Sequence, residues 1–404
     1  MNQQPVNKTE AFVLAVSRRS FLSLWCDSNP QGKNPSKELC DILVVCDPHV
    51  IIISVKEVHY QSDKDPNVAS KRWEREAIDA SVKQIYGAER WIAKATRVVR
   101  KNGLPGLRLP PLEIRRVHRI AVAIGGKGEV PIKSGDLGKG YVHVLTERGF
   151  EDQLTELDTI TDLVGFLTAK EACMGAGCKT LVLGPENNLL GYYLLNHKKF
   201  PTDADVMMID DTLWTGLTER EDYKRKKEAD KISYDWDRLI ELYVGPNREL
   251  LGEPEEQLTG MELALRAMAR ENRLSRRMLA GAMRDFVEQA MNSPLRSRTI
   301  CGDSGVIYVL IFFKPTEDRD RRLAVLNDRI GLARHTIGKG NTVIGIGFVE
   351  SEPGTIAVCE LGYLDATGWS AEDDARAEKL KAERNFETRL MRRSMTELEY
   401  PAAE

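Results

Sequence analysis

The sequence of 404 residues contains no apolar run that approaches the ~20 residues of a membrane-spanning helix. Its first twelve residues, MNQQPVNKTEAF, are polar and lack the apolar core of a signal peptide. The formal net charge is only -3, so overall charge does not indicate a nucleic-acid partner, and such a partner would need a local basic patch. We therefore expect a cytoplasmic protein without a membrane segment.

Several chemical motifs are also missing. The seven cysteines are an odd number, and Cys173 and Cys178 form a C-x4-C pair without a second pair of zinc ligands nearby. We expect reduced, mostly buried thiols. The glycine-rich stretches GGKGE and GDLGKGY do not match the phosphate-binding pattern G-x-x-x-x-G-K-[ST], and no serine stands in G-x-S-x-G. P-loop nucleotide hydrolysis and a serine-triad hydrolase therefore have no support.

The residues that are present favour a folded chain of two or three domains, with 42% hydrophobic and 29% charged residues. Apolar residues at steps of three and four predict helices at 9–24 and 70–100. Runs rich in β-branched residues predict strands at 41–46, 50–58, 117–124 and 141–147. This order of helices and strands predicts an α/β fold class, with one α/β domain in residues 1–150.

The remainder of the chain divides into two parts by pattern. Residues 151–300 are mainly helical, and residues 301–404 return to strands around one helix, followed by a charged final helix. We expect a helical middle region and a C-terminal α/β domain. The middle helices are a candidate surface for a protein partner or for a homo-oligomer.

The stretch ELCDILVVCDPHVIIISVKEV predicts two strands joined by a tight turn. Asp41 begins the first strand, and Ser54 and Lys56 share one face of the second because side chains alternate along a strand. A hairpin brings Asp41 close to that face. A carboxylate is a ligand for Mg²⁺, and a lysine beside such an ion can help to activate water against a phosphodiester.

The number of acids near this hairpin decides whether it could hold a metal ion. One carboxylate holds Mg²⁺ weakly, and the hydroxyl of Ser54 is a poor substitute. Further acids could come from Glu10 on the first helix, or from Glu74 or Glu76 on the helix after the lysine. Glu57 follows the lysine directly and should point to the opposite face.

Some polar side chains stand in apolar surroundings. Gln84 lies on the apolar stripe of the expected helix 70–100, where it either faces the site or bonds to a backbone group. His118 and His143 fall on expected strands and are predicted to be structural rather than catalytic. His49 lies in the turn and is expected to be exposed.

A helix with Glu10, a strand with Asp41, a strand ending in Lys56 and then a long helix together resemble the PD-(D/E)xK nuclease fold. The family's second acid would stand at Ser54, so the chain departs from the pattern. One subgroup of restriction endonucleases has S-x-K there and takes its acid from the following helix. Glu76 resembles that migrated acid, although its distance from Lys56 does not match the subgroup's spacing.

The chain also resembles an uncharacterised group of bacterial proteins with the pattern SFLSLW, KELCDxLVV, S-x-K and GAERWI. Those motifs stand here as SFLSLW at Ser20, KELCDILVV at Lys37, IIISVK at Ile51 and GAERWI at Gly87. The resemblance covers most of the chain, and because the group carries no known activity it supports a fold more than a function.

The nuclease resemblance implies a restriction-endonuclease-like domain at 1–150 that cuts DNA with Mg²⁺ or Mn²⁺, in bacterial defence against foreign DNA. Asp41 would bind the metal, Glu10 and Glu76 would be further ligands, Lys56 would position the nucleophile, and Ser54 would ligate weakly. In the alternative, Ser54 marks lost catalysis and the protein is a binding or assembly module.

Three basic clusters are candidates for contact with the DNA backbone, although each is also typical of a solvated surface. They are Arg97, Arg100 and Lys101; Arg115, Arg116 and Arg119; and Arg273, Arg276 and Arg277.

Overall fold

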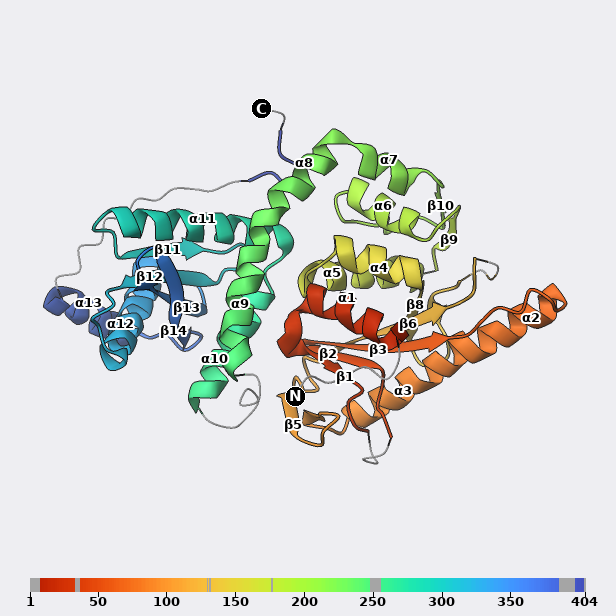
Figure 1. Ribbon diagram of the computed structural model, residues 1–404, viewed down its shortest axis with the longest axis horizontal. Coiled ribbons are helices and arrows are strands. Elements are labelled where there is room, and N and C mark those ends of the chain that lie inside the picture. Colours follow the sequence, from red (N-terminus) through yellow and green to blue (C-terminus); the bar gives the residue numbers. More distant parts are fainter. Residues whose placement is uncertain are drawn as a thin grey trace. The chain divides into compact units, whose positions relative to one another are not determined.

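The computed structural model describes residues 8–32, 37–128, 130, 132–175, 177–247, 256–384 and 397–402. The chain is a mixture of helices and strands in several sheets, as the sequence predicts for the α/β class (Figure 1). It forms two compact units, unit 1 (Met1–Lys224) and unit 2 (Arg225–Glu404). The boundary lies inside the expected helical middle region, and the division at 150 and 300 stays a prediction. None of the helices in the described ranges is long and apolar enough to cross a membrane.

Unit 1 is built on a mixed sheet with helices on both faces. Its helices are α1 (Lys8–Trp25), α2 (Pro66–Trp73), the π-helical η1 (Glu74–Asp79), α3 (Ala80–Ile92), α4 (Glu147–Glu156), α5 (Ile160–Gly175), α6 (Asn187–Leu195), α7 (Leu213–Glu219) and α8 (Glu221–Ala229), whose last turns belong to unit 2. Its strands are β1 (Cys26–Ser28), β2 (Ile42–Cys46), β3 (His49–Glu57), β4 (Arg97–Val99), β5 (Pro105–Arg108), β6 (Arg116–Ile124), β7 (Gly135–Asp136), β8 (Tyr141–Thr146), β9 (Lys179–Val182) and β10 (Val206–Ile209).

The main sheet of unit 1 has the strand order β1-β2-β3-β6-β8-β7. β2 and β3 form an antiparallel hairpin, whereas β3 pairs with β6, and β6 with β8, in parallel. Figure 1 shows α1 on one face of this sheet and α3 on the other. Strands covered on both faces bury every side chain, and this explains the continuous apolar run ILVVC of β2.

The long helix expected at 70–100 has different ends in the structure. α2, η1 and α3 follow one another without a break from Pro66 to Ile92. Asp65 caps the start, because its carboxylate accepts hydrogen bonds from the backbone N of Asn67 and Val68 at 3.0 and 3.2 Å. Beyond Ile92 the chain forms the short hairpin β4–β5 instead of more helix. This hairpin is too short to leave a clear pattern in the sequence.

Unit 2 contains a second, smaller sheet. Its helices are η2 (Asp230–Ser233), α9 (Tyr234–Asn247), α10 (Glu256–Ala269), α11 (Arg273–Asn292), α12 (Arg319–Ile337) and α13 (Ala371–Arg384). Its strands are β11 (Ser297–Cys301), β12 (Ile307–Phe313), β13 (Thr342–Glu352) and β14 (Thr355–Asp365).

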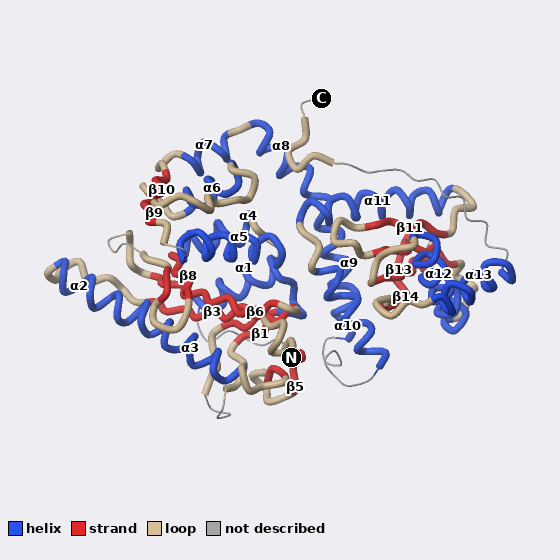
Figure 2. The backbone as a smooth tube through the Cα atoms, turned by 180° about the vertical axis from the view of Figure 1, so that it is seen from behind, coloured by secondary structure: helices blue, strands red, loops and turns tan. Residues whose placement is uncertain are grey.

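The sheet of unit 2 has the order β11-β12-β13-β14 and is parallel only between β12 and β13, which α12 connects (Figure 2). All seven residues of β12 are buried. One face packs on α12, where Val309, Ile311 and Leu326 belong to a single hydrophobic cluster. The other face lies against α11. This unit therefore has a continuous apolar core of its own.

Candidate functional site

The β2–β3 hairpin brings Asp41 and Lys56 together, as the sequence predicts. Ile42 pairs with Ile53, so Asp41, the residue before β2, stands across from Ser54. Oδ2 of Asp41 accepts a hydrogen bond from the backbone N of Val55 at 2.7 Å and lies 3.7 Å from Nζ of Lys56. Asp41 is 5% exposed, whereas the side chain of Lys56 is 33% exposed. Lys56 is therefore the member of this pair that solvent can reach.

Ser54 is fully buried beneath the pair. Its hydroxyl donates a hydrogen bond to Oε1 of Gln84 on α3 at 2.9 Å. Gln84 therefore faces the site, and this hydrogen bond is to a side chain and not to a backbone group. The register places Ala121 and Ala123 of β6 beside Ser54 and Lys56, so the neighbouring strand presents only small side chains here.

Two more carboxylates lie near Asp41. Burial raises the pKa of Asp41; Lys56, the Val55 N–H and the Ser54 hydroxyl oppose this rise, and Glu10 adds to it. Partial burial raises the pKa of Glu38, and Glu10 and Asp41 raise it further. Glu10, in the first turn of α1, also accepts a hydrogen bond from Nδ2 of Asn29 at 3.3 Å. We call Glu10, Glu38, Asp41 and Lys56 the acidic cluster.

Glu38 was not among the residues expected at the site. It stands three residues before Asp41 in the stretch KELCD, ahead of any regular strand, so no periodicity could indicate its direction. The charges of that short stretch are the one signal that could have indicated it.

Glu76 stands apart from these carboxylates. It lies on η1, where Arg72 binds its carboxylate at 3.1 Å and Arg75 at 3.4 Å. The hydrogen bond from Arg72 is the main reason why the pKa of Glu76 is lowered. An exposed acid that is already matched by two arginines of its own helix has little negative charge left to offer a metal ion. Glu57 points to the other face, as expected, because its carboxylate accepts a hydrogen bond from Thr9 on α1.

The chemistry of the acidic cluster suits a hard cation. Its three carboxylates offer only oxygen donors, the kind that Mg²⁺ and Mn²⁺ prefer, and they outnumber the two lysines, Lys56 and Lys101, that act on Asp41 or Glu38. Within the described ranges, however, no three or more His, Cys, Asp or Glu side chains stand together in a ready metal-holding group. The donor set therefore fits the ion in its chemistry, and the side chains would have to converge to bind it.

The basic hairpin β4–β5 lies beside the acidic cluster. Gln31 joins the two regions. It pairs with Glu38 in an isolated β-bridge, its backbone N donates to Val99 O at 2.8 Å, and its Nε2 donates to Lys101 O at 3.1 Å. Lys101 is close enough to Glu38 to oppose the rise in the pKa of that carboxyl. Arg97 and Arg108 are paired across the two strands. The first expected basic cluster thus stands next to the candidate site.

The second basic cluster is largely used within the fold. Arg115 donates to Pro110 O at 2.8 Å and to Ile92 O at 2.5 Å, which fixes the end of α3. Arg119 binds Glu89 at 2.5 Å. Arg116 is the member that remains exposed.

The third basic cluster was wrongly interpreted as a surface for DNA. Arg273, Arg276 and Arg277 are at most 6% exposed. Asp237 accepts hydrogen bonds from Arg273 at 2.9 Å and from Arg276 at 2.5 Å. Arg277 binds Asp230 at 3.1 Å. These arginines hold α11 to η2 and α9, and buried side chains cannot contact a phosphate backbone.

His118 and His143 are buried, but neither ring nitrogen of His143 has a hydrogen-bond partner in the described part of the chain, so a structural role for both stays a prediction. His118 is 6% exposed, and burial lowers its pKa to about 3. His49 is half-buried rather than exposed, because its Nδ1 lies 3.1 Å from Nε2 of His118. Burial also lowers the pKa of His143. Neutral buried imidazoles of this kind belong to the core of the sheet.

No protein-family model matches the chain, and neither does any curated protein or solved structure.

Proposed function

We propose that unit 1 is a PD-(D/E)xK-like domain that hydrolyses DNA phosphodiester bonds with Mg²⁺ or Mn²⁺. The observation that carries this proposal is the meeting of Asp41 and Lys56 on adjacent strands at 3.7 Å, with Glu10 and Glu38 beside them. The chain order of α1, β2, β3 and the helices α2 to α3 is the order that the resemblance implies, which supports the proposal. Defence against foreign DNA in the cytoplasm rests on the resemblance alone.

The roles follow from the positions of the side chains. Asp41, Glu38 and Glu10 would hold the ion, which supplies positive charge for water activation and for the phosphate. Lys56 is half-exposed next to Asp41, so its ammonium group reaches the nucleophile and the charge that develops on the phosphate. Ser54 donates to Gln84 and is better placed to fix α3 against β3 than to bind metal.

DNA cleavage tests the proposal directly. Purified protein is incubated with supercoiled and linear DNA and Mg²⁺ or Mn²⁺, and the wild type is compared with Asp41→Ala and Lys56→Ala. We expect metal-dependent nicking that falls about 10²-fold or more in both variants, because Asp41→Ala removes a carboxylate that would hold the ion and Lys56→Ala removes the cation beside the reacting phosphate. The same assay with RNA of matched sequence shows which of the two nucleic acids is the better substrate.

Two glutamate variants provide a matched control. Glu38→Gln removes an acid of the acidic cluster, and Glu76→Gln removes the acid that the resemblance favoured. We expect Glu38→Gln to lose activity and Glu76→Gln to retain it. If Glu76→Gln is the inactive one, the ligand set proposed here is wrong. If correctly folded proteins cut no DNA with either metal, unit 1 is not a deoxyribonuclease.

One observation favours the second candidate, a catalytically inactive binding or assembly module. Asp41 is almost fully buried and already receives Val55 N–H and Lys56, and the place of the family's second acid is taken by Ser54. Such a domain would bind DNA through the basic hairpin without cutting it. Gel-shift binding of uncleaved DNA that weakens in an Arg97→Gln, Arg108→Gln double variant would support this alternative.

A further inference from the structure

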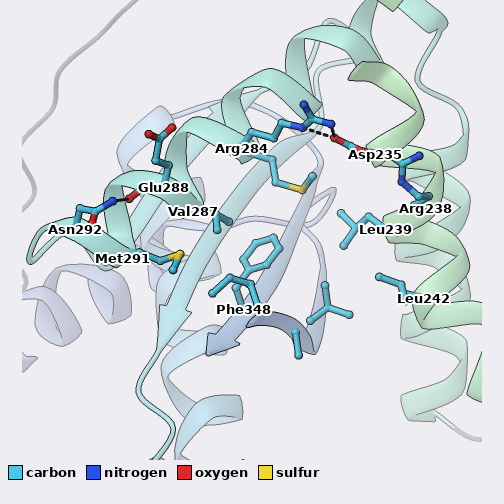
Figure 3. Close-up of a pocket in the computed structure, with 14 residues that line it drawn as sticks. Asp235, Arg238, Leu239, Leu242, Arg284, Val287, Glu288, Met291, Asn292 and Phe348 are labelled. Atoms are coloured by element: carbon cyan, nitrogen blue, oxygen red, sulfur yellow. Dashed lines mark hydrogen bonds and ion pairs between the residues drawn. The ribbon is translucent and has the colours of Figure 1, made fainter. Parts of the chain in front are cut away.

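Unit 2 contains a pocket that the nuclease proposal does not use. It lies between α9, α11 and the strands β13 and β14, and has a volume of about 920 Å³. Figure 3 shows α11 along one side, α9 along the other, and Phe348 of β13 between them. Ligand pockets for small molecules have volumes of roughly 300–1,000 Å³, so this cavity has the size of a binding site.

The wall of the pocket is mainly apolar. Leu239 and Leu242 come from α9, Val287 and Met291 from α11, and Ile356 from β14. Leu242 is 58% exposed and Met291 is 42% exposed. Large apolar side chains that gather around one exposed cavity are typical of a surface that receives an apolar ligand.

The walls are held in place by contacts below the pocket. The hydroxyl of Tyr243 on α9 donates to Glu360 O of β14 at 3.1 Å. On the other side, the rings of Phe286 on α11 and Phe348 on β13 lie 6.4 Å apart. Both helices are thus fixed to the same sheet. The cavity is therefore preformed, which reduces the entropy lost when a ligand binds.

One end of the pocket carries excess positive charge. Asp235 on α9 forms ion pairs with both Arg238 and Arg284. Two guanidinium groups share this carboxylate, and the second acid of the wall, Glu288, follows Arg284 by four residues on α11, so positive charge is in excess at this end only and not over the whole wall. In Figure 3 the acidic Glu288 lies towards the opposite end, beside Met291 and Asn292. The positive end of the pocket is therefore the end with Arg238 and Arg284, and Glu288 lies towards the other end.

We propose that this pocket binds a small amphiphile with an apolar chain and one anionic head group. The chain would lie along Val287, Phe348 and Leu242, and the head group would accept hydrogen bonds from Arg238 and Arg284. Charge complementarity at one end and an apolar wall elsewhere select this class of ligand over a neutral or cationic one. The inference rests on unit 2 alone and is independent of the nuclease proposal.

Calorimetric titration of the full chain tests the ligand class. The probes are dodecanoate, dodecanol and dodecylamine, each below its micelle concentration, so that chain length is constant and only the head group changes. We expect one dodecanoate per chain, bound about tenfold more tightly than either of the other two. The absence of saturable dodecanoate binding, or equal binding of all three probes, would overturn the proposal.

Two substitutions locate the site. Val287→Trp fills the cavity and should reduce dodecanoate affinity by about tenfold or more. Leu263→Trp, at a 37% exposed position on α10 outside the pocket wall, is its control and should bind like the wild type. Arg284→Gln leaves Asp235 paired with Arg238 alone, so the preference for dodecanoate over dodecanol should disappear. Unchanged binding in folded Val287→Trp would place the ligand elsewhere and refute this site.

Vesicles distinguish a free amphiphile from a membrane lipid that carries the same chemistry. We expect the protein to remain in solution when vesicles of phosphatidylcholine and phosphatidylglycerol are sedimented. Sedimentation with the vesicles that Val287→Trp abolishes would show that the pocket takes a lipid from a bilayer, against the free ligand proposed here.

Discussion

The two units bury charge in different ways. In unit 2 the buried arginines Arg273 and Arg276 both reach Asp237, and Arg277 reaches Asp230, which also binds Lys226. In unit 1 the buried ionisable groups are matched less well. Asp41 has one lysine and two other acids around it, and Lys170, at 6% exposure, donates to the neutral hydroxyl of Ser134 at 3.1 Å while Glu186 is the acid that acts on it.

This difference separates structural charge from candidate functional charge. Buried ions that are paired and hydrogen-bonded contribute to a unique packing, and removal of one partner is costly. Buried groups with an excess of charge of one sign have shifted pKa values and are typical of binding and catalytic sites. By this criterion the arginines of unit 2 are part of the scaffold, whereas the acidic cluster of unit 1 is a candidate site.

The largest expected effect comes from breaking a buried pair in unit 2. Arg276→Met removes the hydrogen bonds that Arg276 donates to Asp237, to Glu271 O and to Ala269 O. We expect a loss of about 3–5 kcal/mol in the free energy of unfolding of this unit. Hydrogen exchange of peptides from residues 225–404, followed by mass spectrometry, measures it locally.

An exposed ion pair in the same unit is the control for Arg276→Met. Arg321, in the first turn of α12 and 66% exposed, lies 3.5 Å from the half-buried Glu317, two residues before that helix. Because exposed pairs contribute little, Arg321→Met should change the stability by less than about 1 kcal/mol. Equal effects of the two substitutions would show that the buried arginines of unit 2 are no more structural than an ion pair at its surface.

A smaller effect is expected from acid on unit 1. Burial lowers the pKa of His118 from 6.5 to about 3, so the unfolded chain binds a proton that the folded chain does not. The contribution of His118 to the free energy of unfolding is therefore fully present above pH 6.5. It decreases as the pH falls from 6.5 to 3, by about 1.4 kcal/mol per pH unit for one proton. In His118→Gln this part of the slope should be absent. Urea unfolding at pH 6.5, 6.0 and 5.5 measures the difference, and parallel slopes for the two proteins would contradict it.

The smallest effect is expected at the acidic cluster itself. Asp41→Asn keeps an oxygen for Val55 N–H but removes a charge that burial and Glu10 disfavour. The stability of unit 1 at pH 7 should stay the same or rise by up to about 1 kcal/mol, while any nuclease activity is lost. Thermal unfolding with parallel cleavage assays tests both parts. A loss of more than about 2 kcal/mol would make Asp41 a structural residue like Arg276.

The sequence predicted local features of the fold better than distant ones. The apolar runs around Val44 and Ile52 identified β2 and β3, because strands covered on both faces are apolar throughout. β1, β4 and β5 went unpredicted, since each has only three or four residues. The end of α3 depends on Arg115, which lies 23 residues beyond the carbonyl of Ile92 that it binds, and no local pattern reports such a contact.

The candidate site followed the same rule. The proximity of Asp41 and Lys56 could be predicted because a tight hairpin determines it. The surface interpretation of Arg276 failed because its partner Asp237 lies 39 residues away on another helix. Glu76 was favoured from its place in the chain, but its pairing with Arg72 depends on which side of the helix faces solvent.

The position of the acidic cluster along the chain has a consequence for folding. All its members lie between Glu10 and Lys56, and Asp41 meets Lys56 through a hairpin, a contact of low sequence separation that forms within microseconds. β6 joins β3 only after the helices and the basic hairpin between them have closed a long loop, which is the slower kind of step. We therefore expect Asp41 to meet Lys56 before the central parallel strands of unit 1 associate.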